Sequence, residues 1–372
     1  MDSQYLFCRQ KQRHIIHYRE QQHLYTKNEC KRTVNPIPEY TVLLSNSVHL
    51  WLSKFLQAQK HLLTFMTYRY LAFGIPVLSD IELPALLPLN KNISPERPVT
   101  VKLGKVPQTL KTPGIQADYF TYCNAEEMIF TLPKKIKFYI SKGENIIIEP
   151  IHYDYSRYLL YFYSNCLAAM LLQRNLIPFH VSGVFTQPGK VVLFAAPSGT
   201  GKSTLAVKLQ ELGFAPFTDD TAILFVKDGK CYAQASYPMI RLWENALDKQ
   251  KMLNIDEKQI IYDGEKDKYG FLFHSQFADT PAEVERIIFM QKDAYPQIQT
   301  LKIKSTDAFK ALADNVYRRH WITALQMHKQ QFLLISQILQ TVPNLLIIRP
   351  LNHDTFDTLP QVIKKILNNN DN

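Results

Sequence analysis

The sequence has few cysteines, and none of them is spaced for metal or redox chemistry. Cys8, Cys30, Cys123, Cys166 and Cys231 are scattered over 372 residues, and no C-x-x-C pair occurs. An odd number of widely separated thiols gives no zinc or redox motif. Thiols of this kind fit a reducing compartment, so we predict a cytoplasmic protein.

Long apolar runs are also lacking. The longest, residues 158–172, is interrupted by Ser164 and Asn165 and ends in a polar pair. That pattern predicts a buried helix and no membrane span. The first residues are polar and basic, without the apolar core of a signal peptide, so none is expected.

Acidic residues are fewer than basic ones, and the imbalance is strongest near the N-terminus. The formal net charge is +10, and residues 1–66 hold nine Lys or Arg against four acids. We interpret this segment as a basic extension with an amphipathic helix over 44–66. A membrane-surface or nucleic-acid role is the alternative, but no RNA-binding aromatic motif supports it, and nucleic acid is not an expected partner. His14, His17 and His23 lack a further ligand at a fixed spacing, so a polar tail explains them better than a metal cluster.

One stretch carries a specific motif. Residues 191–206 form a β-type run, a loop of small residues and a helix start, the pattern whose backbone N–H groups and helix N-terminus cradle nucleotide phosphates. Ala196 replaces the first glycine of G-x-x-x-x-G-K-[ST], which alanine tolerates at negative φ. A chance loop at a helix N-cap is the alternative, but the flanking strand and helix disfavour it. We predict ATP and Mg²⁺ as ligands, and the nucleotide-binding residues Pro197, Ser198, Gly199, Thr200, Gly201, Lys202, Ser203 and Thr204, with Lys202 at the β- and γ-phosphates and Ser203 on the metal.

Two acids follow the next predicted strand, residues 214–218. Asp219 and Asp220 lie 17 and 18 residues after Lys202. Open α/β sheets bind ligands at the carboxyl ends of their strands, so we expect the pair beside the metal and the γ-phosphate. One carboxylate can hold Mg²⁺ while the other accepts a proton from an attacking hydroxyl. A surface turn capped by aspartates is the alternative.

A histidine completes a recognisable arrangement. His180 lies in an apolar run sixteen residues before Ala196, and a lone histidine there is most often a hydrogen-bonded core residue. Followed by this loop and Asp219-Asp220, however, it resembles HPr kinase/phosphorylase and its relative phosphoenolpyruvate carboxykinase. The sequence is most similar to HPr-kinase-like proteins of peptide-modification clusters. That resemblance covers about residues 68–368 and includes the stretches 171–180, 238–242, 287–290, 315–318 and 342–350.

The resemblance implies an α/β fold with a P-loop core of the HPr-kinase/PEP-carboxykinase type over 154–368. Short β-type runs predict a smaller β-rich domain over 67–153, after the extension 1–66, and the polar tail 369–372 is expected to be disordered. By position, the resemblance makes Asp219 the catalytic base, Asp220 a metal ligand and Lys202 a phosphate contact. It places His180 close to the metal or the γ-phosphate.

Two motifs of these families are missing. No Arg-Gly-x-Gly element follows the acids, the part that HPr kinase/phosphorylase uses for its protein substrate and for phosphorolysis, so HPr itself is not the expected substrate. The additional arginine and lysine motifs of the carboxykinase are absent too. Arg241, Arg318 and Arg319 are candidates for binding substrate or transition-state phosphate, with a solvated or structural role as the equal alternative.

These features predict an ATP-dependent kinase that transfers the γ-phosphoryl group to a hydroxyl of Ser or Thr in a peptide or protein. A small-metabolite kinase with the same site and a non-catalytic ATP-binding sensor or assembly module are the alternatives. A sensor needs no base at the γ-phosphate, so the intact Lys202, Ser203, Asp219 and Asp220 favour chemistry. The acceptor, the choice of ATP or GTP, and the oligomeric state, a homo-oligomer included, stay open.

Periodicity and turn residues also predict the individual elements. A hairpin turn is expected at 142–145. The predicted helices are 154–174, 202–212, 307–318, 321–342 and 355–367, and the predicted strands are 100–106, 119–123, 128–132, 138–140, 146–149, 179–186, 190–196, 214–218, 222–226, 231–235, 284–291, 300–303 and 345–348.

Overall fold

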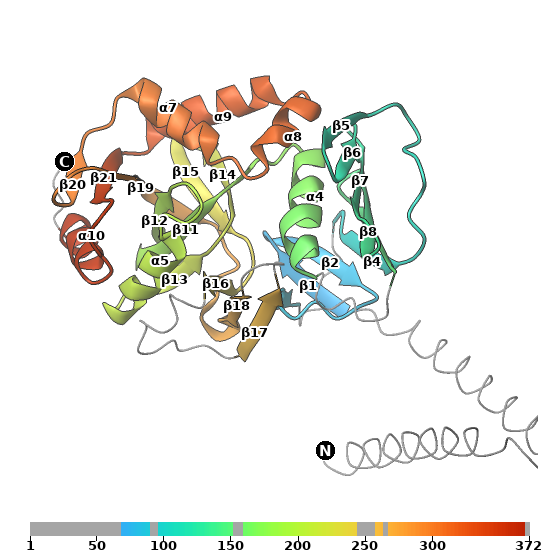
Figure 1. Cartoon of the computed structure of the whole chain (residues 1–372), viewed down its shortest axis with the longest axis horizontal. Helices are drawn as coiled ribbons and strands as arrows, with labels where there is room; N and C mark the ends of the chain where they lie inside the picture. Colours follow the sequence, from blue (N-terminus) through green and yellow to red (C-terminus); the bar gives the residue numbers. More distant parts are fainter. Residues whose placement is uncertain (1–67, 90–95, 152–158, 244–256, 263–266, 369–372) are drawn as a thin grey trace, which may run out of the picture. The chain divides into compact units, whose positions relative to one another are not determined.

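The computed structural model describes residues 68–89, 96–151, 159–243, 257–262 and 267–368. Its mixed α/β architecture confirms that part of the predicted fold class (Figure 1). Among these residues no helix is both long and apolar enough to cross a bilayer. The predicted extension, its helix and histidines, and the C-terminal tail lie outside the described residues.

The first sheet has nine strands in the order β3-β1-β2-β4-β9-β8-β7-β6-β5. Five of them correspond to predicted strands, and the turn at Lys142 and Gly143 has the two positive φ angles of a tight hairpin. β1, β2, β3 and β5 were not predicted individually. The strands are β1 (Tyr68–Ala72), β2 (Ile75–Ser79), β3 (Leu87–Pro88), β4 (Val99–Leu103), β5 (Ile115–Asp118), β6 (Thr121–Cys123), β7 (Glu127–Leu132), β8 (Ile136–Ser141) and β9 (Asn145–Pro150).

The second sheet also has nine strands, in the order β10-β14-β15-β19-β12-β11-β13, with β21 beside β19 and β20 beside β21. β12, β19 and β21 are mutually parallel. The strands are β10 (Pro178–Phe179), β11 (Val181–Gln187), β12 (Lys190–Ala195), β13 (Pro216–Thr218), β14 (Ala222–Lys227), β15 (Lys230–Ala235), β19 (Ala282–Asp293), β20 (Gln299–Leu301) and β21 (Asn344–Pro350).

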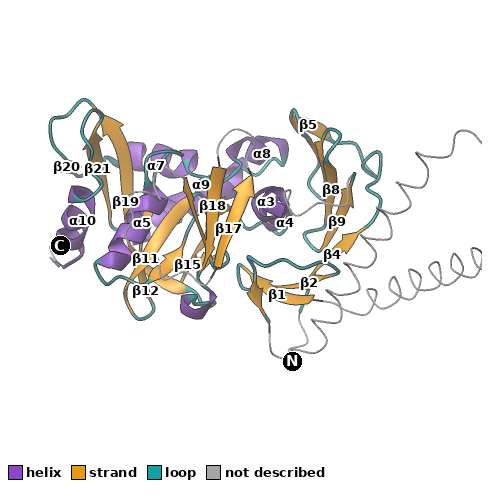
Figure 2. Ribbon diagram, turned by 60° about the horizontal axis from the view of Figure 1, so that its bottom comes forward, coloured by secondary structure: helices purple, strands orange, loops and turns teal. Residues whose placement is uncertain are grey.

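Helices cover both faces of the second sheet, as the side chains of β12 show. Val191 and Leu193 join the core cluster that includes α9 (His328–Thr341). Val192 and Phe194 join the cluster that includes α5 (Lys202–Glu211) and α10 (Thr358–Asn368). A strand buried on both faces requires an unbroken apolar run, which explains the sequence at 191–195. Figure 2 shows these helices, in purple, alongside the strands.

A third, antiparallel sheet was not predicted. Its order is β16-β18-β17, and Val207 of α5 packs against Ile240, Leu242 and Phe271 from it. The strands are β16 (Met239–Trp243), β17 (Glu257–Tyr262) and β18 (Asp267–Leu272).

One predicted helix is wrong. Residues 321–342 do not form a continuous helix but divide into α8 (Arg319–Ala324) and α9. The break falls at Gln326, whose φ of 57° is left-handed and cannot continue an α-helix. Neither glycine nor proline marks it, so pattern alone could not reveal it. The remaining helix, α7, spans Ser305–Asp314.

The predicted helix 154–174 is described from residue 159 onward. It contains α3 (Leu159–Tyr161), a π-helical turn over Phe162–Cys166 and α4 (Leu167–Gln173). The π turn is a local widening of the helix, a feature found most often at functional sites. Ser164 lies on this turn, and the Tyr317 hydroxyl interacts with it. The turn therefore contacts the segment between α7 and α8.

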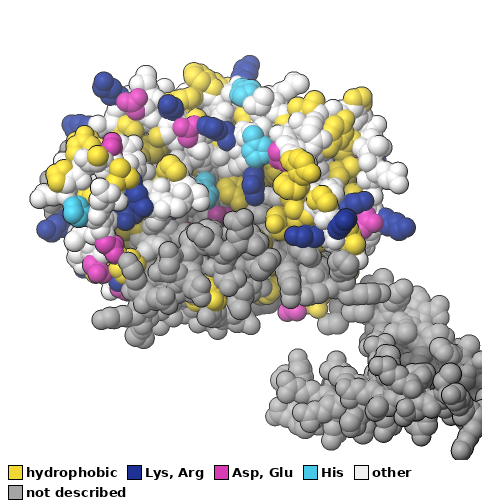
Figure 3. Space-filling view, viewed as in Figure 1, with side chains coloured by type: hydrophobic (Ala, Val, Ile, Leu, Met, Phe, Trp, Pro, Cys, Tyr) yellow, Lys and Arg dark blue, Asp and Glu magenta, His cyan; other side chains and the backbone are white. Residues whose placement is uncertain are grey.

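The hairpin β5–β6 carries an exposed aromatic pair and forms hydrogen bonds with α8. Tyr119 is 84% exposed and its ring meets Phe120 edge to face. Asp118 accepts hydrogen bonds from the His320 ring and the Trp321 indole, both at 2.9 Å. Figure 3 shows hydrophobic side chains gathered on the right of this face, where Figure 1 places β5 and β6. The first sheet is therefore attached to the segment that follows Tyr317.

Candidate functional site

Three segments meet at one edge of the second sheet. β12 runs antiparallel to β11, with Ala195 opposite Val181, and β11 runs antiparallel to β13. The carboxyl ends of β12 and β13 therefore lie at the same edge as the amino end of β11. The Gly-rich loop (residues 196–201) follows β12, the two aspartates follow β13, and His180 precedes β11. The topology thus brings all three predicted parts of the site to one edge.

The Gly-rich loop has the backbone of an anion cradle. Gly199 and Gly201 have φ of +79° and +100°, values that residues with a Cβ rarely adopt. A Cβ on Gly199 would meet nothing within 4 Å, and Pro197 to Gly199 are exposed. Gly201 caps α5, whose first N–H groups have no partner within the helix. These donors and the helix dipole suit a phosphate group.

The loop lysine is folded back onto the loop. Lys202 is 5% exposed, and its ammonium donates to the carbonyl of Ala196. Ser203 and Thr204 lie half-buried on the first turn of α5. An ammonium has three donors, so the contact with the Ala196 carbonyl does not prevent Lys202 from also binding a phosphate.

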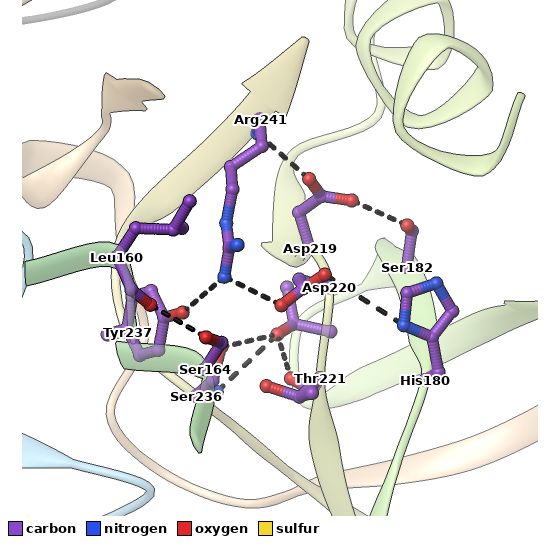
Figure 4. Close-up of polar contacts among 11 residues, drawn as sticks. Leu160, Ser164, His180, Ser182, Asp219, Asp220, Thr221, Ser236, Tyr237 and Arg241 are labelled. Carbon is purple, nitrogen blue, oxygen red and sulfur yellow. Dashed lines mark hydrogen bonds and ion pairs between the residues drawn. The ribbon is translucent and has the colours of Figure 1, made fainter. Parts of the chain in front are cut away.

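The two aspartates have different surroundings (Figure 4). Asp219 is 1% exposed. Its Oδ1 accepts from the Ser182 hydroxyl at 2.6 Å and its Oδ2 accepts from the backbone N–H of Arg241 at 3.0 Å. Asp220 has a side chain 16% exposed and a left-handed φ of 70°. Asp220 is therefore the more accessible carboxylate of the pair.

Arg241 is the partner of Asp220. Its Nη2 donates to Asp220 Oδ2 at 2.7 Å and to the Tyr237 hydroxyl at 2.8 Å. Burial disfavours the charged guanidinium, but Asp220, Tyr237 and Tyr317 together outweigh it and raise the pKa of Arg241. The structure thus pairs this predicted phosphate-binding residue with a carboxylate, in a buried position.

His180 lies next to Asp220 and is held from two sides. Its backbone N–H donates to the carbonyl of Asn315 at 2.6 Å, and its ring stacks on Tyr317 with centroids 5.7 Å apart. Nδ1 lies 3.8 Å from Asp220 Oδ1, too far for a hydrogen bond. Burial lowers the pKa of His180, and Asp220 opposes this only in part. Burial thus favours the neutral imidazole, which can act as an acceptor or a metal ligand.

The other two predicted arginines lie beyond Tyr317. Arg318 has a left-handed φ of 55° and its guanidinium lies 5.2 Å from the ring centre of Tyr317. Arg319 is exposed and forms an ion pair with Asp314. The structure places Arg318 one residue from the tyrosine that stacks on His180, whereas Arg319 points to a surface acid.

Sequence reasoning missed two cations at the same sheet edge. Lys292 of β19 lies opposite Arg349 of β21. Three residues earlier, Phe289 of β19 lies opposite Leu346 of β21, and on its other side it lies opposite the last residue of β12. Only the sheet register brings them beside the loop. They help to line a cavity of about 130 Å³, formed by Gly199, Thr200, Gly201, Thr204, Leu205, Lys292, Arg349, Asp354, Thr355, Phe356, Leu359 and Pro360.

The donor set fits a metal that arrives with a nucleotide. Among the described residues no group of three or more His, Cys, Asp or Glu side chains could hold a metal by itself. Magnesium carried by a nucleotide needs only one or two protein oxygens besides phosphate and water. The Ser203 hydroxyl and the Asp220 carboxylate are oxygens of this kind, and the Gly-rich loop fits the phosphates.

Comparisons with known proteins give only a distant likeness. No model of a protein family and no curated protein matches this chain. Among solved structures, the HPr(Ser) kinase/phosphatase from Coxiella burnetii aligns at 13% identity, over 51% of this chain and 93% of that chain, with a TM-score of 0.25. A TM-score of that size carries no conclusion about activity, so the function has to be inferred from the site.

Proposed function

We propose that this protein is an ATP-dependent kinase of the cytoplasm that transfers the γ-phosphoryl group to a hydroxyl of Ser or Thr in a peptide or protein. The observation that supports this best is the meeting, at one sheet edge, of the Gly-rich loop, the acids Asp219 and Asp220, and His180. The division into a β-rich domain, 67–153, and a P-loop domain, 154–368, belongs to the same proposal.

The nucleotide binds along the Gly-rich loop. Residues 197–204 surround the phosphates with N–H groups, and Lys202 binds the β- and γ-phosphates. Ser203 and Asp220 hold Mg²⁺. Bound Mg²⁺–ATP supplies the phosphoryl group and a cation that offsets its charge.

The two carboxylates divide the remaining work. Asp219 as the base requires that the acceptor hydroxyl replace the Ser182 hydroxyl, which now donates to it. Asp220 would need no such exchange, because it is partly exposed. A base must come within hydrogen-bond reach of the proton it removes, although such contacts often form only in the substrate complex. We keep Asp219 as the proposed base, and the variants described in the Discussion decide between them.

His180 and Arg241 maintain the charge distribution around Asp220. The guanidinium of Arg241 forms an ion pair with Asp220, and this pair favours the cationic state of Arg241. A neutral His180 adds no positive charge that would compete with Mg²⁺ for the carboxylate. Arg318, beside Tyr317, is the remaining candidate for binding the acceptor or its phosphate.

The direct test is incubation of the purified full-length protein with γ-labelled ATP and Mg²⁺. Two acceptor pools are offered: a degenerate Ser/Thr peptide library and a panel of small hydroxyl metabolites. Label in peptides supports the proposal, and label in metabolites alone supports the small-metabolite kinase. ATP binding without transfer to either pool would contradict a kinase and favour the sensor. A Lys202→Met protein serves as the control for contaminating kinases.

A further inference from the structure

Arg349 makes a contact with the Gly-rich loop that none of the roles above includes. It lies near the end of β21, and its Nη1 donates to the backbone carbonyl of Thr200. Its Nε donates to the Thr355 hydroxyl at 2.7 Å. The guanidinium thus joins the loop to the segment before α10 with two directed bonds.

The loop sequence accommodates this contact. A Cβ on Gly201 would lie 2.8 Å from Arg349 Nη1, closer than Cβ atoms come to other heavy atoms. Gly201 is needed for its φ of +100°. An added Cβ would also displace the flexible end of Arg349 from its present position.

Holding the Thr200 carbonyl fixes a donor of the loop. The peptide bond between Thr200 and Gly201 is planar and trans, so its C=O and N–H point in opposite directions. When Arg349 holds the carbonyl, the N–H of Gly201 is aimed away from Arg349. That N–H is the first of the series that continues into α5.

A second attachment keeps the same segment against α5. Lys208 pairs with Asp357 at 3.3 Å and lies 4.4 Å from the ring centre of Phe356. The segment that carries Thr355 is thus fixed to the second turn of α5, while Arg349 fixes it to the loop before the first turn. The segment whose Thr355 hydroxyl accepts from Arg349 is therefore itself held in place by contacts with α5.

From this geometry we propose that Arg349 is a positioning residue that holds the Gly-rich loop in its anion-binding conformation before any ligand arrives. The inference rests on the proposed nucleotide site but concerns the loop's backbone. Preorganised donors bind an anion without the cost of ordering them. Loss of Arg349 should weaken every ligand that uses the loop N–H groups, whether or not it has a nucleoside.

Two ligands separate positioning of the loop from a contact of Arg349 with the nucleoside. Affinities of Mg²⁺–ATP and of inorganic tripolyphosphate are measured by calorimetry for wild type and Arg349→Met. We expect both to weaken by a similar factor, about 10- to 100-fold, the size expected for one charge-assisted hydrogen bond. Weakening of ATP alone would show that Arg349 contacts the nucleoside and would overturn the inference, as would no change in either ligand.

Further variants control for charge and folding. Arg349→Lys keeps the charge but cannot hold the carbonyl and the hydroxyl together, so it should follow Arg349→Met. Thr355→Val removes only the second acceptor and should weaken both ligands by a smaller factor. Lys365→Met removes an exposed charge of α10 outside the cavity and should leave both affinities unchanged. A Tm within a few degrees of wild type excludes unfolding as the cause.

A ligand-free measurement keeps this inference separate from the proposed function. Amide hydrogen exchange at residues 200–203 should be faster in Arg349→Met than in wild type, with exchange in β14 and β15 unchanged. Equal exchange in the two proteins would overturn the positioning role. A wild-type protein that binds neither ATP nor tripolyphosphate would contradict the nucleotide site, and the exchange result would still decide the role of Arg349.

Discussion

The Gly-rich loop offers backbone groups to solvent, whereas the acid cluster of Asp219, Asp220 and Arg241 joins buried side chains to one another. Pro197 to Gly199 are exposed, and the loop's shape depends on two positive φ angles. In the acid cluster, Asp219 and Arg241 are buried and each has at least two hydrogen bonds. The two halves of the site therefore depend on different physics, local conformation in one and tertiary packing in the other.

This difference predicts how each half responds to change. A backbone cradle tolerates side-chain substitution but is sensitive to a Cβ or to altered φ. A buried hydrogen-bonded cluster is sensitive to loss of any member, because the groups left behind lose their partners. Substitutions in the two halves should therefore separate binding from chemistry and from folding.

The largest effect is expected in the acid cluster. Asp219→Asn should lower phosphoryl transfer by roughly 10²–10⁴, the usual contribution of a general base, while Mg²⁺–ATP affinity stays within about twofold. Asp220→Asn should first raise the Mg²⁺ concentration needed for half-maximal phosphoryl transfer, since a neutral amide attracts the metal less than a carboxylate does. Turnover and Mg²⁺–ATP binding are measured for both, with Asp314→Asn, a surface acid paired with Arg319, as the control.

Normal transfer by Asp219→Asn, together with loss of transfer in Asp220→Asn at saturating Mg²⁺, would reverse the two roles. Asp219 would then be a structural acid that holds Ser182 and the Arg241 backbone. Ser182→Ala separates these cases further, because it opens Asp219 to a substrate hydroxyl without removing either carboxylate.

In the loop half, Lys202→Met should lower transfer by about 10²–10³, the loss seen when one donor to developing charge is removed. Lys329→Met is the matched control, because Lys329 is an exposed lysine of α9. Transfer rates are compared at saturating ATP. Equal rates for Lys202→Met and wild type would remove Lys202 from the chemistry.

A Cβ in the loop tests its dependence on backbone shape. Gly201→Ala combines a strained φ with a contact to Arg349, and we expect weaker binding of Mg²⁺–ATP. Gly189→Ala is the matched control, with φ +75° and nothing within 4 Å of its Cβ. Each left-handed alanine should cost about 1–2 kcal/mol of stability, but only Gly201→Ala should lose affinity. Equal ATP affinity in both variants would show that the loop does not bind phosphate through its backbone.

The smallest effect concerns His180 and pH. Its folded pKa lies below the unfolded value, so the unfolded chain binds the proton more readily and folding is favoured by higher pH. This contribution is fully present above about pH 6.5, the ordinary histidine pKa, and is lost as the pH falls below it. Tm measured from pH 7.5 to 5.5 should fall less steeply in His180→Asn than in wild type. Equal slopes of Tm against pH in the two proteins would mean that His180 does not contribute to the pH dependence of stability.

Local patterns predicted the elements that depend on local sequence. β12 and α5 agree with the prediction to within one residue at each end, because an apolar run and a glycine loop mark them. The break at Gln326 and the third sheet were not predicted, because no turn residue and no hydrophobic periodicity marks either of them. The contacts of Asp219 with Ser182 and of Arg349 with Thr200 depend on strand register, which a single sequence does not reveal.

The position of β21 and α10 also affects how the protein can be shortened for expression. A fragment that stops at residue 343 would keep the whole glycine motif and both aspartates. It would lose the strand that pairs with Ile287 to Asp293 of β19, and with it the side chain that meets the Thr200 carbonyl. Boundaries drawn around the motif alone would thus yield a fragment with an unpaired sheet edge. A useful minimal fragment has to extend through residue 368.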